Sequence, residues 1–235
     1  MTLFAGNLFI TFLLVLIIFP THISSFEDYQ SRIVGGIKSY ENKWPFTAAL
    51  LYRGEQMCGG VVWDQWHVLT AAHCLCHNKS TRVHRPLPYS VFLGHHNLEA
   101  RFWFWDWLLR DDYEIGVKEI ISHPMYDPKI HYRFDIAILR LSTPIDFGHQ
   151  HIGVRCVCQP EPLENLDLTN CYTMGWGSTV PVHGNRTAVK STQLLEIAIP
   201  ILSDQKCSRH SVHYNPHWHV CAMAPEGGRD ACKGK

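Results

Sequence analysis

Short segments with the pattern of β-strands recur along this chain, and they constrain its fold more than any other feature. Tyr113, Ile115 and Val117 alternate with polar residues or glycine, which is the period of a half-buried strand. Further short apolar or β-branched segments span 47–52, 58–63, 90–93, 136–141, 171–175 and 194–199. Many strands at this spacing predict an all-β barrel or sandwich. One short helix is expected at 203–209, where the Ser203 hydroxyl can accept a backbone N–H at the helix start.

The charge balance excludes one class of partner. The 235 residues contain 21 Lys and Arg against 21 Asp and Glu, a formal net charge of zero, whereas nucleic-acid-binding proteins usually carry a basic excess. A hydrophobic fraction of 46% with eight Trp predicts a packed core. This length suits one large domain or two small ones, and the Pro- and Gly-containing stretch 144–170 is the candidate connection between two halves.

The beginning of the sequence has the pattern of a secretion signal. Leu8–Phe19 is an uninterrupted run of twelve residues, nearly all of them apolar, and about twenty are needed to cross a bilayer. We therefore predict that residues 1–25 form a signal peptide, with a signal anchor as the alternative. In a secreted, extracellular protein, Asn78 and Asn185 would be open to glycosylation, because each begins an Asn-x-Ser/Thr sequence. Membrane contact by the remaining chain is not expected.

Five short motifs occur in a fixed order after this signal. They are Arg-Ile-Val-Gly-Gly at 32–36, Thr-Ala-Ala-His-Cys at 70–74, Asp-Ile-Ala-Ile-Leu at 135–139, Met-Gly-Trp-Gly at 174–177 and Gly-Arg-Asp-Ala-Cys-Lys-Gly at 228–234. Any one of these motifs would be weak evidence, but the ordered set is highly specific. Together they resemble the chymotrypsin/trypsin family of serine endopeptidases.

The resemblance implies a fold of two Greek-key antiparallel β-barrels. Residues 33–235 would form the peptidase domain, with a first barrel over about 33–150 and a partial second barrel over about 160–235. Some strands of the family's second barrel correspond to positions beyond 234, and strand edges without partners are a liability. We therefore expect a well-formed first barrel and a less stable second one.

The resemblance also implies roles for individual residues. His73 matches the general base and Asp135 the carboxylate that orients it. An imidazole can take a hydroxyl proton and return it to a leaving amine, and a buried carboxylate fixes the tautomer of that imidazole. Asp230 matches the floor of the primary specificity pocket, where a carboxylate attracts Arg or Lys side chains. Gly234 matches the glycine whose N–H contributes to the oxyanion hole.

The motif at 32–36 resembles a zymogen cleavage site. A trypsin-like activating protease would cut after Arg32 and remove the propeptide 26–32. In the family, the freed amino group of Ile33 pairs with an Asp immediately before the nucleophilic Ser. This sequence has Lys235 at that Asp position and no serine after Ser211, so we expect the chain as written to be inactive.

Three interpretations follow from the absent serine. The chain is an incomplete or alternatively terminated secreted protease zymogen, a non-catalytic homologue that acts as a binding or decoy protein, or a failed product that is cleared. The partners implied by the resemblance are protein or peptide substrates, protease inhibitors and the activating protease.

The nine cysteines cannot all pair within one chain. The resemblance pairs Cys58 with Cys74 and Cys207 with Cys221. It assigns Cys171 and Cys232 to partners beyond Lys235. The remaining three are Cys76, Cys156 and Cys158, and a bridge between the first two is one open pairing.

No metal or cofactor is predicted. The family's calcium-binding loop begins with an acid near the position of His95, and calcium needs several oxygen ligands. Four histidines lie near the end of the chain at 210, 213, 217 and 219; surface histidines are the favoured interpretation and a zinc site the alternative. The aromatic stretch 102–109 is interpreted as a loop packed on the barrel, with an exosite or a membrane-leaning loop as alternatives.

Overall fold

Strands dominate the part of the chain that the computed structural model describes, which comprises residues 36–76, 80–99, 113–148, 151, 153–158, 171–177 and 191–223. The strands are β1 (Ile37–Lys38), β2 (Thr47–Tyr52), β3 (Glu55–Val62), β4 (His67–Thr70), β5 (Tyr89–Leu93), β6 (Glu114–Ser122), β7 (Ala137–Leu141), β8 (Tyr172–Gly175) and β9 (Leu195–Ala198). The helical segments are the 3-10 turn η1 (Ala72–Cys74) and the helix α3 (Asp204–His210). The prediction of an all-β fold is confirmed.

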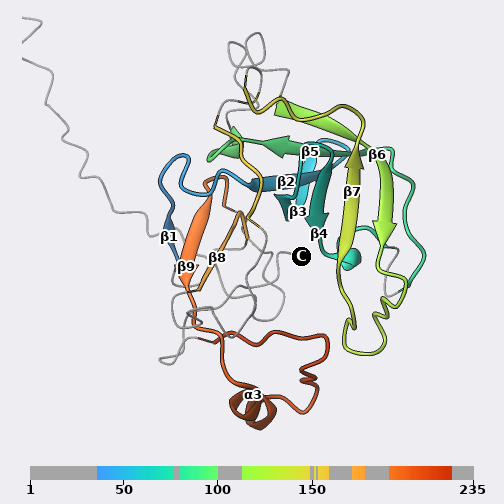
Figure 1. Ribbon diagram of the computed structural model, residues 1–235, viewed down its shortest axis with the longest axis vertical. Helices are drawn as coiled ribbons and strands as arrows, with labels where there is room; N and C mark the ends of the chain where they lie inside the picture. Colours follow the sequence, from blue (N-terminus) through green and yellow to red (C-terminus); the bar gives the residue numbers. More distant parts are fainter. Residues whose placement is uncertain are drawn as a thin grey trace, which may run out of the picture. The chain divides into compact units, whose positions relative to one another are not determined.

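Six strands close into an antiparallel barrel in the order β2-β3-β4-β7-β6-β5 (Figure 1). The last pairing joins β5 back to β2, with Leu50 opposite Val91. The barrel interior is filled by aliphatic side chains such as Leu50, Val91 and Leu139, which are at most 1% exposed. Full burial of one such side chain contributes about 1.5–3 kcal/mol, and closure leaves no free strand edge. The barrel is therefore a rigid base for the loops between its strands.

The hairpin between β2 and β3 explains where the predicted boundaries were wrong. Arg53 and Gly54 both have positive φ, 53° and 81°, so that Tyr52 pairs with Glu55 across a two-residue loop. Turns of this kind continue the twist of the flanking strands, and β3 therefore begins at Glu55 rather than at 58. The short strands β1 and β4 were not predicted at all, because two and four residues are too few to show a period.

Strand β2 is buried on both of its faces. Ala48 and Leu50 point into the barrel core, while Ala49 and Leu51 pack on the outside in a second cluster that includes Trp176. The indole Nε1 of Trp176 donates a hydrogen bond of 3.2 Å to a backbone carbonyl beyond β5. Burial on both faces explains why apolar and polar residues do not alternate along β2.

A second, three-stranded sheet has the order β1-β9-β8 (Figure 1). Its central strand contains Glu196, which is only 3% exposed. The carboxylate accepts a hydrogen bond of 2.6 Å from Trp44 Nε1 and a second one from Lys43 Nζ. Burial raises the pKa of Glu196, but hydrogen bonds from Lys43, Trp44 and Ser39, together with the charge of Lys43, outweigh it and hold that pKa below its ordinary value. The ion pair ties this sheet to the segment that enters β2.

Helix α3 begins after Ser203, close to the predicted position. The Ser203 hydroxyl makes no capping hydrogen bond, contrary to the expectation from sequence. With seven residues, α3 is the longest helix in the part of the chain that the structure describes, and no helix there is long and apolar enough to span a membrane.

Candidate active site

His73 lies on a turn that is held from several sides. It follows β4 within the 3-10 turn η1, where the flanking Ala72 and Cys74 are buried. Cys74 is bonded to Cys58 of β3 with a sequence separation of 16, which confirms this predicted pair. The hydroxyl of Thr70, the last residue of β4, donates a hydrogen bond of 2.7 Å to Gly59 O. The His73 side chain remains 35% exposed on this fixed base.

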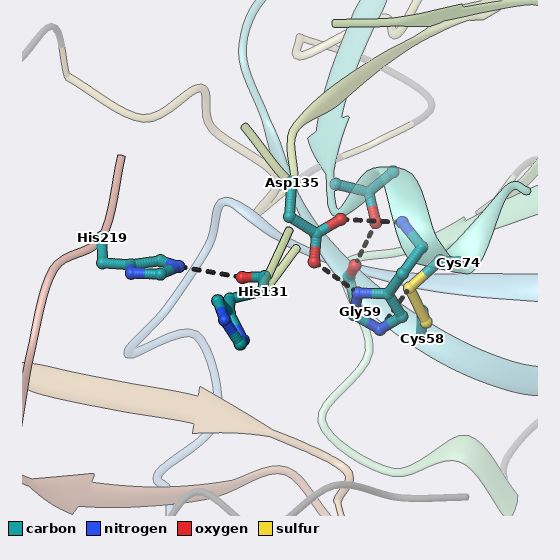
Figure 2. A network of polar contacts seen from close by, with 8 residues as sticks. Cys58, Gly59, Cys74, His131, Asp135 and His219 are labelled. Carbon is teal, nitrogen blue, oxygen red and sulfur yellow. Dashed lines mark hydrogen bonds and ion pairs between the residues drawn. A yellow bond between two sulfur atoms is a disulfide. The ribbon is translucent and has the colours of Figure 1, made fainter. Parts of the chain in front are cut away.

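Asp135 reaches His73 because β4 and β7 are neighbours in the barrel. Thr70 pairs with Ala137, so the residues just after β4 and just before β7 lie at the same end. Asp135 Oδ1 accepts a hydrogen bond of 2.8 Å from the His73 backbone N–H, and Oδ2 lies 2.6 Å from His73 Nδ1 (Figure 2). The sequence placed these residues 62 positions apart, and the barrel brings them into direct contact.

The two contacts determine the form of the imidazole. An ionised carboxylate can only accept, so His73 Nδ1 must donate its proton to Asp135. In the neutral ring, Nε2 then has no proton, and its lone pair is available on the side away from Asp135. Nε2 lies 3.6 Å from Cys74 Sγ, a disulfide sulfur that has no proton to donate to this lone pair. This arrangement can take a proton from an approaching hydroxyl.

Aromatic side chains surround the pair on the barrel side. The Tyr132 ring meets the His73 imidazole edge-on, with 5.9 Å between centroids and 74° between planes. Burial and then the nearby Asp135 carboxylate raise the pKa of the Tyr126 phenol. The same two causes raise the pKa of the half-buried Cys76 thiol. The Asp135 carboxylate itself makes an ion pair with the His73 ring.

A cavity of about 1000 Å³ opens beside Asp135. One wall is the segment 128–136, which includes Tyr132, and the other is the segment 207–222, which includes His213 and Trp218. Asp135 is part of the lining of this cavity, and His73 is not.

Comparison with known proteins agrees with this geometry. A family model described as Trypsin matches residues 33–235. The chain belongs to the trypsin family.

Individual relatives of this trypsin-family chain are longer proteins. It is 30% identical to Ovochymase-2 of Mus musculus, 32% to Coagulation factor XI of Bos taurus and 32% to Transmembrane protease serine 5 of Homo sapiens. Each match covers 87% of this chain but only 31%, 30% and 41% of the respective relative. The chain therefore matches less than half the length of these relatives.

Both disulfides predicted between described cysteines are present in the structure. Cys207 and Cys221 form the second predicted bond, which closes the segment after α3. The open pairing of Cys76 with Cys156 is not formed; both are thiols, the first half-buried and the second exposed, as is Cys158. The pairing of Cys171 with a partner beyond Lys235 stays a prediction.

Several predicted functional residues lie outside the described ranges. They are Arg32, Ile33, Asn78, Asn185, Asp230, Cys232, Gly234 and Lys235, together with the aromatic stretch 102–109 and residues 1–25. His95 is within the described part, where its ring stacks on Phe92 with 4.4 Å between centroids.

The potential metal ligands at the His73 turn do not form a metal site. In the described ranges, the group of three potential ligands within 4.8 Å is Cys58, His73 and Cys74. Both sulfur atoms belong to the disulfide, whereas metal binding requires thiolates.

Two neighbours of the site were missed by sequence reasoning. Tyr132 precedes Asp135 by three residues, and this proximity is the signal that could have identified it. His219 was assigned to a surface cluster, but its Nε2 lies 2.9 Å from the carbonyl oxygen of His131 (Figure 2). Nothing in its local sequence indicates that contact.

Proposed function

We propose that this chain carries the general-base half of a trypsin-like serine endopeptidase that cleaves peptide bonds after Arg or Lys. The observation that carries the proposal is the His73–Asp135 pair, with both carboxylate oxygens engaged at 2.8 and 2.6 Å. This geometry leaves Nε2 as the base, as general-base catalysis on a serine hydroxyl requires. Membership of the trypsin family supports the same chemistry.

The remaining roles are assigned by motif. Asp230 forms the floor of the pocket that selects basic side chains, and the Gly234 N–H stabilises the oxyanion. The protein is secreted through a signal peptide at 1–25 and activated by cleavage after Arg32. Removal of the propeptide 26–32 frees the amino group of Ile33, and the peptidase domain is residues 33–235.

A polypeptide limited to these 235 residues is proposed to be inactive. It contains no serine after Ser211 to act as nucleophile. In comparable triads, loss of the serine lowers turnover about a million-fold, which corresponds to about 8 kcal/mol of barrier. His73 would then hold its proton-accepting geometry without a hydroxyl to act on.

One observation favours a second candidate function, a non-catalytic homologue that binds substrates or inhibitors as a decoy. Lys235 occupies the position of the acid that pairs with the Ile33 ammonium in the family. The two groups have like charge, and loss of the partner of a buried ion pair typically costs about 3–5 kcal/mol. A binding role does not require this pair.

The test uses the polypeptide of residues 26–235, cut after Arg32 by added trypsin that is then removed. Fluorogenic Arg and Lys peptides measure turnover, a serine-directed fluorophosphonate measures covalent labelling, and immobilised benzamidine measures binding in the basic-residue pocket. We expect no turnover, no label and benzamidine binding that is lost in Asp230→Ala. Saturable cleavage with labelling would contradict the proposed inactivity.

Sequencing of the transcript past the Gly234 codon separates the two candidates. Codons for Asp-Ser-Gly-Gly after Gly234 would support the protease, and the matched variants His73→Ala and Asp135→Asn of that longer protein should then lose about three or more orders of magnitude in kcat. A stop after Lys235, together with inhibitor capture from the culture medium, would support the decoy.

A further inference from the structure

The segment that leads into Asp135 has an unusual backbone. His131, Tyr132 and Phe134 all have positive φ, at 50°, 56° and 52°. This left-handed region is unfavourable for residues with a Cβ and rarely recurs within four positions. Asp127 and Arg133 close the turn through two backbone hydrogen bonds of 3.0 and 3.1 Å. Contacts from outside the turn add to these internal bonds.

One such contact comes from the segment closed by the Cys207–Cys221 disulfide. His219 Nδ1 accepts a hydrogen bond of 3.1 Å from the Asn215 backbone N–H. Because this nitrogen accepts, it carries no proton, and the neutral ring must have its proton on Nε2. Nε2 lies 2.9 Å from His131 O (Figure 2), so it donates to that carbonyl. The first left-handed residue of the turn is thus held by one specific tautomer of His219.

Two further side chains reinforce this contact at the same place. The Trp218 ring lies 5.9 Å from the Phe134 ring and 5.8 Å from the Arg133 guanidinium. The His213 ring stacks on the His131 ring with 3.9 Å between centroids and 21° between planes. These contacts all reach the turn from the 207–221 segment, through three side chains, His213, Trp218 and His219, that line the 1000 Å³ cavity.

We propose that His219, through its Nε2–H donated to His131 O, is a positioning residue that holds Asp135 in place against His73. The inference rests on the proposed general-base role of His73. Phe134 directly precedes Asp135, so a shift of the turn moves the carboxylate that both the backbone N–H and Nδ1 of His73 require. His219 contacts no reacting atom and acts through the turn alone.

The experiment is nuclear magnetic resonance on the 33–235 polypeptide with ¹⁵N-labelled histidine. Two signals are read: the strongly deshielded His73 Nδ1 proton, which reports the bond to Asp135, and the ¹⁵N shifts of His219, which report its tautomer. The variants are His219→Ala, His219→Gln, whose side-chain amide can still reach His131 O, and His219→Asn, whose shorter side chain can replace only the Nδ1 acceptor. His217→Ala is the control, because its exposed ring contacts no residue of the turn in the described structure.

We expect His219 to be protonated on Nε2 and not on Nδ1. The His73 proton should exchange with solvent about fivefold faster in His219→Ala and His219→Asn, the factor expected for loss of one net hydrogen bond. It should keep its wild-type rate in His219→Gln and His217→Ala. This rescue pattern distinguishes positioning of Asp135 from a general loss of structure.

Two results would overturn the inference alone: the opposite His219 tautomer in the wild type, or an unchanged His73 exchange rate in both His219→Ala and His219→Asn. The tautomer measurement needs no variant and remains decisive where a variant fails to fold. Absence of the deshielded His73 proton in the wild type would instead overturn the proposed function, and the inference with it.

Discussion

Replacement of Glu196 tests whether the buried ion pair holds the second sheet to the barrel. The carboxylate is 3% exposed and accepts from Trp44 Nε1 and Lys43 Nζ. A hydrogen bond to a charged group contributes about 1.5–3 kcal/mol, against about 1 kcal/mol for a neutral one. Glu196→Gln keeps an acceptor for Trp44 but loses the charge, so it should cost about 1–2 kcal/mol at pH 7. Glu196→Ala leaves both donors without this acceptor; because Lys43 is 35% exposed and partly rehydrated, we expect about 3 kcal/mol.

The difference in unfolding free energy between wild type and Glu196→Gln should depend on pH. The folded pKa of Glu196 lies below its ordinary value of 4.5, so the charged form stabilises the fold above about pH 4.5. This contribution falls as the pH drops through the folded pKa, because the protonated form binds Lys43 less well. The gap between wild type and Glu196→Gln should therefore narrow as the pH falls below 4.5.

Urea unfolding of the 33–235 polypeptide at pH 7, 5 and 3 measures these values. Glu119→Gln is the matched control, since Glu119 faces Arg140 at 3.7 Å with about half of each side chain exposed. Such a surface pair should contribute at most about 0.5 kcal/mol. Equal losses for Glu196→Gln and Glu119→Gln, or a gap that is as wide at pH 3 as at pH 7, would refute the reasoning.

Three further predictions concern the barrel and the thiols. Gly60→Ala should cost about 1–3 kcal/mol in urea unfolding, because its Cβ would lie 2.7 Å from a backbone oxygen of β4, whereas Gly59→Ala, with its nearest atom at 3.8 Å, should be close to neutral. Leu139→Ala should cost about 2–5 kcal/mol, since Leu139 is fully buried in the barrel; a loss below 1 kcal/mol would contradict that packing. Maleimide should label the exposed Cys156 faster than Cys76 in the folded chain, because burial raises the pKa of the Cys76 thiol. Mass spectrometry measures the two labelling rates, and equal rates would contradict the burial of Cys76.

The fold class followed from local pattern alone. Strands of five or more residues, such as β2, β6 and β7, show their apolar period or run within the segment itself. The strands β1 and β4 have no such period, because they exist only through pairing with β9, β3 and β7. The start of β3 was misplaced for a related reason: the Arg53–Gly54 turn sets the register, and its polar flank carries no strand signal.

For the site, the sequence by itself indicated the residues to which we assign the chemistry. The motifs around His73 and Asp135 are continuous in sequence. The residue type at each of these positions can be recognised from a short motif, because the motif is local in sequence.

Only the tertiary structure decided how those residues meet. The pairing of β4 with β7 brings His73 and Asp135 to one end of the barrel and so assigns the proton to Nδ1. The contact of His219 with a turn 88 residues away depends on a disulfide-closed segment and a left-handed backbone. Contacts of this kind depend on chain geometry rather than on residue type, because a histidine on the surface and one that holds a turn can have the same neighbours in sequence.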